Sequence, residues 1–172
     1  MRIVDIPEFK DKDKLVVLDI AAAKKQDLLL PNVCKLMDKH NVGSMLVTKR
    51  GHLEGIFTER DLLKKVASKK KDISTIEILD VMTKNPKTAF KDDQVADSMK
   101  RMSANRFRHL PIVDHKKQLV GIVSQGDFVA YTWAQVLERA SKTTIASVAT
   151  SYQIWLILIA VLVYTLSIIA FL

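Results

Sequence analysis

VCKLMDKHNVGSMLVTKRGHLEGIFTERDLLKKV, residues 33–66, recurs as VADSMKRMSANRFRHLPIVDHKKQLVGIVSQGDFVAY, residues 95–131. The two copies stay in register when Met37 is set against Met102, up to a one-residue difference in a polar turn. Beyond the turn, GIFT at 55–58 faces GIVS at 121–124. Self-similarity of this kind is the signature of a repeated structural unit. The chain therefore builds one supersecondary unit twice.

Each copy predicts the order helix, strand, turn, strand, helix. Apolar residues at helical spacing open each copy, and the closing helices are expected to begin near Asp61 and Asp127. Two short apolar strands around a polar turn predict a hairpin in each copy. A β-rich stretch precedes each copy and is expected to pair with its hairpin. The predicted strands are 44–48 and 53–57 in the first copy, 110–113 and 119–123 in the second, with 15–18 and 87–90 upstream.

The organisation along the chain follows from this repeat. Neither unit can bury its apolar face alone, so we expect the two to pack together. We place the junction at residues 80–86, where Pro86 breaks helix and is expected to hold Asn85 extended. The apolar run at 27–31 replaces a polar helix start, and we expect it to contact the core. The predicted divisions are an N-terminal segment 1–14, repeats 15–79 and 80–140, a juxtamembrane linker 141–151 and a transmembrane helix 152–172.

The C-terminal stretch YQIWLILIAVLVYTLSIIAFL, residues 152–172, carries no charge. At ~1.5 Å per helical residue it spans about 30 Å, which matches the hydrocarbon thickness of a bilayer. A buried core helix or hairpin is the alternative. Arg139 and Lys142 are the last charges before it, so the positive side is the N-terminal side. We expect a single-pass C-terminal anchor with the body in the cytoplasm, and the choice of membrane stays open. The closing helix could continue into the span, or the Ser/Thr-rich linker could act as a flexible tether.

The rest of the chain is basic. The formal net charge of +8, with 27 Lys and Arg, suits an anionic partner: a phosphate-bearing ligand, nucleic acid or anionic lipid. Charge alone does not choose among them. Cys34 is the only cysteine, which excludes an intrachain disulfide, and it is predicted to be a buried thiol on the apolar face of a helix.

A hydroxyl residue follows the second hairpin strand of each copy, and an aspartate stands three residues later. A pattern of this form can be a capping box, which satisfies backbone donors and needs no ligand. It can also hold an anion on the hydroxyl and amides, while the carboxylate accepts hydrogen bonds from a ribose diol. The same residues can do both. They are Thr58 with Asp61, and Ser124 with Asp127.

The motifs GIFTERD, RHLPIVD and GIVSQGD closely resemble the paired CBS (cystathionine-β-synthase) domains, over roughly residues 15 to 140. The resemblance implies an α+β fold in which tandem βαββα repeats pack through their sheets as one Bateman module. It also implies a homodimer, and clefts that bind adenosine-containing ligands such as AMP, ADP, ATP, NAD or S-adenosylmethionine. By position, Asp61 and Asp127 would take the ribose hydroxyls, and Thr58 and Ser124 would contact ribose or phosphate.

The resemblance also assigns a phosphate role to Arg108 and His109, which stand before the Leu-Pro strand. A guanidinium suits that role, whereas His109 could equally be an exposed basic residue at a strand start. The first copy has Gly43 and Ser44 at these positions. We therefore expect unequal clefts, one competent for phosphate and one weak or empty.

No catalytic motif is present: the chain has no nucleophile elbow, no HExxH, no Gly-rich phosphate loop, no base expected beside Cys34 and no metal-ligand spacing. We expect a sensor rather than an enzyme, with no required cofactor. The leading interpretation is a membrane-anchored, cytoplasm-facing regulatory module that binds an adenosine-containing ligand and modulates an unidentified membrane partner. The alternatives are a ligand-free scaffold and, less favoured, a basic nucleic-acid-binding domain.

Overall fold

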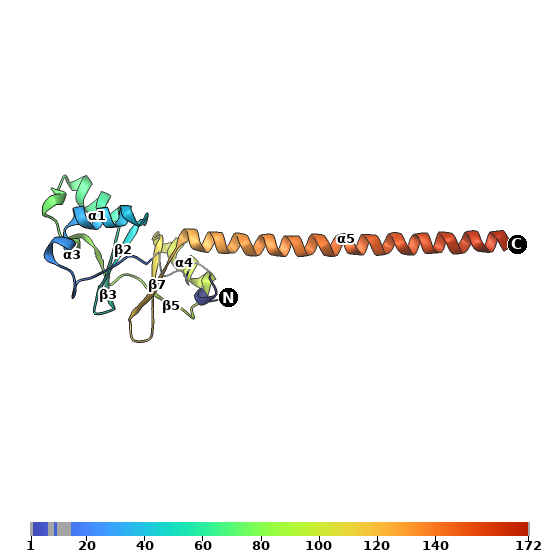
Figure 1. Cartoon of the computed structure of the whole chain (residues 1–172), viewed down its shortest axis with the longest axis horizontal. Coiled ribbons are helices and arrows are strands. Elements are labelled where there is room, and N and C mark those ends of the chain that lie inside the picture. Colours follow the sequence, from blue (N-terminus) through green and yellow to red (C-terminus); the bar gives the residue numbers. More distant parts are fainter. Residues whose placement is uncertain (1, 7–8, 10–14, 172) are drawn as a thin grey trace. The chain divides into compact units, whose positions relative to one another are not determined.

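The structure, a computed structural model, describes the backbone of residues 2–6, 9 and 15–171. Within this set, the side chains of 139–151 and 164–171 are left out of the description. The chain divides into two compact units, Met1–Val129 and Ala130–Leu172. The first repeat and all but the end of the second lie in the first unit, which is an α+β structure with two sheets (Figure 1).

The first sheet has four strands in the order β1-β2-β3-β4. Strand β1 runs parallel to β2, and the other neighbours are antiparallel. The β2–β3 turn has positive φ at both Arg50 (53°) and Gly51 (83°), as a two-residue type I′ turn requires. The strands are β1 Val17–Asp19, β2 Ser44–Lys49, β3 His52–Thr58 and β4 Thr83–Lys84.

The second sheet repeats the first three strands of this arrangement, in the order β5-β6-β7, with β5 parallel to β6. Both predicted hairpins and both upstream strands are therefore confirmed. The two sheets meet near their hairpin turns, where His52 bridges Gln118 and the Leu119 amide donates to the Gly51 carbonyl at 3.0 Å. The strands are β5 Ala89–Phe90, β6 His109–Val113 and β7 Leu119–Ser124.

An amphipathic helix opens each repeat, α1 (Leu30–Lys39) in the first and α4 (Val95–Asn105) in the second. Leu30, Val33 and Met37 of α1 are buried in one core with residues of β2 and β3. The burial of Leu30 confirms the expected core contact of the apolar run at 27–31. Cys34 of α1 is only partly buried, and this burial raises the pKa of its thiol.

The segment between the repeats belongs to the first sheet. Helix α3 (Ile78–Val81) buries Ile78 and Val81 in the first core, and β4 pairs with β3. The first sheet therefore extends to Lys84, past residue 79. Asn85 has a φ of 47°, so the predicted extended conformation is wrong. Asparagine tolerates this left-handed conformation, and its amide donates to the Glu54 carbonyl at 3.2 Å.

The described part of the N-terminal segment completes the second repeat in a similar way. The amide of Ile3, which begins the short 3₁₀ helix Ile3–Asp5, donates to the Asp93 carbonyl at 3.0 Å. Ile3 and Ile6 are fully buried. Arg2 forms an isolated antiparallel β-bridge with Gln94, the residue before α4. Glu77 forms the same kind of bridge with Leu29, the residue before α1. Each repeat is thus closed by the segment that precedes the other one.

The second repeat ends in helix α5, Gln125–Phe171, which also contains the predicted linker and residues 152–171 of the predicted span; Leu172 lies outside the described residues. Within the described residues, no helix is both long enough and apolar enough to cross a membrane. The predicted transmembrane helix at 152–172 is therefore not found there. The side chains of 164–172 lie outside the described residues.

We predict that Gly121→Ala destabilises the fold through the N-terminal segment. A Cβ at residue 121 would lie 2.6 Å from Cε2 of Phe9, closer than carbon atoms can approach. Overpacking of this kind costs about 1–3 kcal/mol, so urea unfolding of the full chain in detergent should show a loss of that size. In a Phe9→Ala background the loss should shrink to a few tenths.

The control for this prediction is Gly126→Ala, because a Cβ there meets only Ser124 Oγ, at an ordinary 3.5 Å. This variant should not be destabilised. An equal cost of Gly121→Ala with and without the Phe9 ring would contradict the close packing.

Candidate functional site

Two clefts open in the first unit, and each contains one of the hydroxyl–aspartate pairs. The Asp61 cleft has a volume of about 320 Å³ and is lined by Thr58 and Asp61. The Asp127 cleft has a volume of about 340 Å³ and is lined by Ser124 and Asp127. Both volumes are at the small end of the range for small-molecule sites. Gly43 and His109 line both clefts, so the clefts share part of their walls.

Thr58 and Asp61 form the predicted capping box at the start of α2 (Glu59–Asp61). The Thr58 amide donates to Asp61 Oδ2 at 3.0 Å, and the Asp61 amide donates to Thr58 Oγ1 at 3.3 Å. The Thr58 hydroxyl also donates to Oδ2 at 2.8 Å. The structural reading of this motif is therefore realised, and Oδ2 accepts two hydrogen bonds from one residue.

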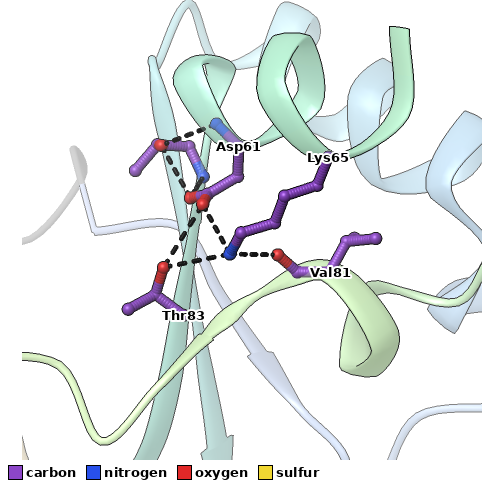
Figure 2. Close-up of polar contacts among 5 residues, drawn as sticks. Asp61, Lys65, Val81 and Thr83 are labelled. Carbon is purple, nitrogen blue, oxygen red and sulfur yellow. Dashed lines mark hydrogen bonds and ion pairs between the residues drawn. The ribbon is translucent and has the colours of Figure 1, made fainter. Parts of the chain in front are cut away.

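The other carboxylate oxygen of Asp61 is held by Lys65 and Thr83 (Figure 2). Lys65 Nζ lies 2.7 Å from Oδ1, and the Thr83 hydroxyl donates to Oδ1 at 3.2 Å. Lys65 Nζ also donates to the Val81 carbonyl at 2.7 Å and to Thr83 Oγ1 at 3.3 Å. Lys65 thus joins Asp61 to the segment that connects the repeats. Lys65 was not predicted from the sequence, although its i,i+4 spacing from Asp61 is a signal for such a pair.

Lys65 lies in a π-helical turn, Leu62–Val66, which directly follows α2. Turns of this type are rare and are found often at functional sites. In the second repeat an α-helix, α5, follows the capping box instead. Four residues after Asp127 the sequence has Tyr131 in place of lysine.

Asp127 makes fewer contacts than Asp61. The Ser124 amide donates to Asp127 Oδ2 at 2.7 Å, and the Asp127 amide donates to Ser124 Oγ at 3.2 Å. Within the described part of the chain, no lysine or arginine forms an ion pair with Asp127. The capping box is present in both repeats, but the two carboxylates differ in how many donors they already hold.

Arg108 and His109 precede and begin β6 of the second repeat, yet Arg108 lines the Asp61 cleft of the first. The structure therefore brings Arg108 together with Thr58 and Asp61, and His109 lies between the two pairs. Two further basic residues line the Asp61 cleft and were missed in the sequence. They are Arg60, whose guanidinium donates to the Arg106 carbonyl, and Lys87, whose amine donates to Asn105 Oδ1 at 2.5 Å.

Burial lowers the pKa of His109 below its ordinary value of 6.5, and the positive charge of Arg108 lowers it further. Glu59 and Asp127 act in the opposite direction, and Arg60 lowers the pKa again. His109 is therefore neutral at neutral pH. A phosphate bound beside it would favour the protonated form, because an anion stabilises a neighbouring cation.

Comparison with known families gives a match over both repeats. The family described as CBS domain matches residues 25–68 and 78–133. A CBS domain-containing protein from Arabidopsis thaliana, the mitochondrial CBSX3, is 38% identical over 100 residues, which cover 55% of this chain and 48% of that protein. The CBS domain-containing protein YhcV from Bacillus subtilis is 31% identical over 121 residues, covering 68% of this chain and 82% of YhcV. The match thus spans only about half of CBSX3.

Solved structures share the fold. The CBS domain pair of protein MJ0100, in complex with 5′-methylthioadenosine and S-adenosyl-L-methionine, has a TM-score of 0.62 at 25% identity and covers 78% of this chain and 98% of that chain. Protein PAE2072 from Pyrobaculum aerophilum, complexed with AMP, has a TM-score of 0.64 at 22% identity, covering 82% of this chain and 99% of that chain. At this identity the PAE2072 likeness concerns the fold alone.

The lowered pKa of His109 predicts that acid destabilises the first unit. The unfolded chain takes up a proton at this histidine before the folded chain does, so the free energy of unfolding should fall as pH drops below about 6.5. Above that pH both states are neutral and the effect vanishes. Urea unfolding of the full chain between about pH 8 and about pH 5 should show the fall, and His109→Gln should remove part of it.

The matched control is His40→Gln, since His40 is exposed and lies in α1's C-cap. This variant should keep the pH dependence of the parent chain. An NMR titration in which His109 protonates above pH 6.5 in the absence of ligand would contradict the assignment.

Proposed function

The chain belongs to the CBS domain family, and we propose that it is a regulatory module that binds an adenosine-containing ligand in its clefts and modulates a partner. The candidates are AMP, ADP, ATP, NAD and S-adenosylmethionine. Support comes from relatives with the same fold, of which one holds AMP and one holds 5′-methylthioadenosine and S-adenosylmethionine. No catalytic role and no required cofactor are part of the proposal.

The observation that carries this proposal is the composition of the Asp127 cleft. Val16, Leu46 and Ile122 supply apolar surface, which suits the faces of an adenine ring. Ser124 and Asp127 lie at the same cleft, and a carboxylate is the acceptor that a ribose diol requires. A cleft with an apolar wall and one carboxylate matches a nucleoside better than it matches a nucleic-acid backbone.

Ligand binding would change the effect on the partner by favouring one arrangement of the two repeats over another, because a ligand shifts an equilibrium only by its differential affinity for the two states. Both clefts contain residues of both repeats, such as Gly43 with Asp127 and Arg108 with Asp61. An occupant therefore contacts both repeats at once. We propose a homodimer as the functional state, following the family resemblance, and a membrane protein as the partner that is modulated.

We propose in addition that residues 152–172 anchor the chain to a membrane, with the N-terminal body in the cytoplasm. The stretch has no charged residue. Its described large apolar side chains, from Tyr152 to Val163, are about half exposed or more in the structure. Surface of this kind, larger than a soluble chain usually leaves uncovered, favours a lipid or protein environment.

Calorimetric titration of the full chain in detergent tests the ligand proposal. AMP, ATP, NAD and S-adenosylmethionine are the probes, and saturable binding of at least one is expected. Asp127→Ala should weaken it about tenfold or more, because the ribose hydroxyls lose a charged acceptor. Absence of heat with every probe would favour a scaffold whose capping boxes are only structural. If the chain binds an oligonucleotide with an affinity that falls steeply with salt and is unchanged by Asp127→Ala, the nucleic-acid alternative would be favoured.

Membrane fractionation of cells that express the chain tests the anchor. The parent chain should stay in the membrane pellet after an alkaline carbonate wash. Leu158→Lys combined with Val161→Lys should release it, since each lysine near the bilayer centre costs about 3 kcal/mol. Leu137→Lys is the matched control, because Leu137 is also an exposed leucine of α5 but lies outside the stretch. Retention of the double variant in the pellet would contradict the anchor.

A further inference from the structure

The two aspartates differ in the number of hydrogen bonds that they can still accept. A carboxylate offers about four lone-pair positions. Asp61 already receives two donors from Thr58 on Oδ2, and one each from Lys65 and Thr83 on Oδ1. As it stands, Asp61 has no position left for a ribose diol.

Asp127 has this capacity. Among the described residues, the Ser124 amide is the one donor to its carboxylate, so Oδ1 receives no hydrogen bond from them. Asp127 lines the cleft. The counterpart of Lys65 is missing in the sequence, because Tyr131 stands at that position. The ribose-reading role suggested for both aspartates therefore suits Asp127 and does not suit Asp61.

The net charges of the two clefts also differ. The Asp61 cleft is lined by Arg60, Lys87 and Arg108, and the negative charge of Asp61 is balanced by Lys65. Glu59 is the remaining acidic residue in its lining. The Asp127 cleft is lined by Asp127 and two histidines, and its described lining includes no lysine or arginine. The first cleft is thus cationic and the second is weakly anionic.

We propose that Lys65 makes the two clefts chemically different. The Asp127 cleft binds the ribose of an adenosine, whereas the Asp61 cleft binds a phosphate group and does not recognise ribose. The inference rests on the proposed adenosine binding and assigns a part of the ligand to each cleft. Lys65 acts as a positioning residue, since it fills Asp61 Oδ1 rather than contacting the ligand. The phosphate belongs either to the nucleotide whose adenosine occupies the Asp127 cleft, because Gly43 and His109 line both clefts, or to a separate molecule.

The test compares AMP with 2′-deoxy-AMP by calorimetry on the full chain in detergent. The parent chain should prefer AMP about tenfold or more, the size of a hydrogen bond to a charged acceptor. Asp127→Asn should abolish this preference, whereas Asp61→Asn should leave it intact. Lys65→Met frees Asp61 Oδ1 and should add a second, ribose-sensitive binding event. Lys64→Met, the neighbouring exposed lysine, is the matched control and should behave as the parent chain.

Pyrophosphate identifies the source of the phosphate. If pyrophosphate competes with ATP but binds independently of adenosine, the nucleotide's own phosphates occupy the Asp61 cleft. If it binds without affecting ATP, the phosphate is a separate ligand. In both cases Arg108→Gln should weaken the binding of pyrophosphate about tenfold.

Two results would overturn the inference. One is a preference for AMP over 2′-deoxy-AMP that disappears in Asp61→Asn and survives in Asp127→Asn. The other is a Lys65→Met chain that keeps its thermal stability and shows no added ribose-sensitive event. Failure of the underlying function looks different, because then no adenosine compound binds to the parent chain at all.

Discussion

Each sheet of this protein is closed by a segment that lies outside the repeat it completes. Ile78 and Val81 come after the first repeated stretch and are buried in its core, and β4 then pairs with β3. Ile3 and Ile6 come before the first repeat and are buried against the second. A sheet of a few short strands is stable only when its apolar face is packed against other elements. The segments around Ile78 and Ile3 supply part of that packing, and they tie the two repeats together in one unit.

The same polar bonds that end the sheets also form the candidate site. Strands β3 and β7 each end on a hydroxyl residue whose backbone amide is satisfied by an aspartate three residues later. That bond places a carboxylate at a cleft whether or not a ligand is bound. The capping role and the binding role therefore do not exclude one another, and the number of remaining acceptor positions decides between them. Because Lys65 and Thr83 occupy Oδ1 of Asp61, two copies of one motif end with different chemistry.

The repeat made the hairpins predictable, because the strands from 44 to 58 and from 110 to 123 repeat a pattern whose apolar positions agree. The exchanged segments were not predictable in this way. Ile3 and Ile6 flank Val4 and Asp5 in a segment too short to show a clear helical or strand period, so only their tertiary contacts make them part of the core. The left-handed Asn85 overrode the preference that Pro86 imposes. Thr58, Asp61, Ser124 and Asp127 were found as pairs, and Lys65 had an i,i+4 signal that was overlooked. Lys87 and Arg108 reach the Asp61 cleft only because the fold brings distant residues together.

The energies of the contacts around Asp61 determine how far a structural change at this residue is transmitted. Lys65 ties Asp61 to the Val81 carbonyl, so a change at the cleft acts on the segment between the repeats. The Lys65 side chain is 36% exposed and the Asp61 side chain 13%, so solvent screens the ion pair in part and its contribution is on the order of 1 kcal/mol. Burial of Ile78 and Val81 contributes about 1.5–3 kcal/mol for each side chain. The apolar contacts therefore keep α3 in place when Lys65 moves. A ligand that displaces Lys65 would change the hydrogen bonds of Thr83 and β4 first, and the larger packing of the two repeats would follow only if the ligand also contacts the second repeat through Arg108 or His109.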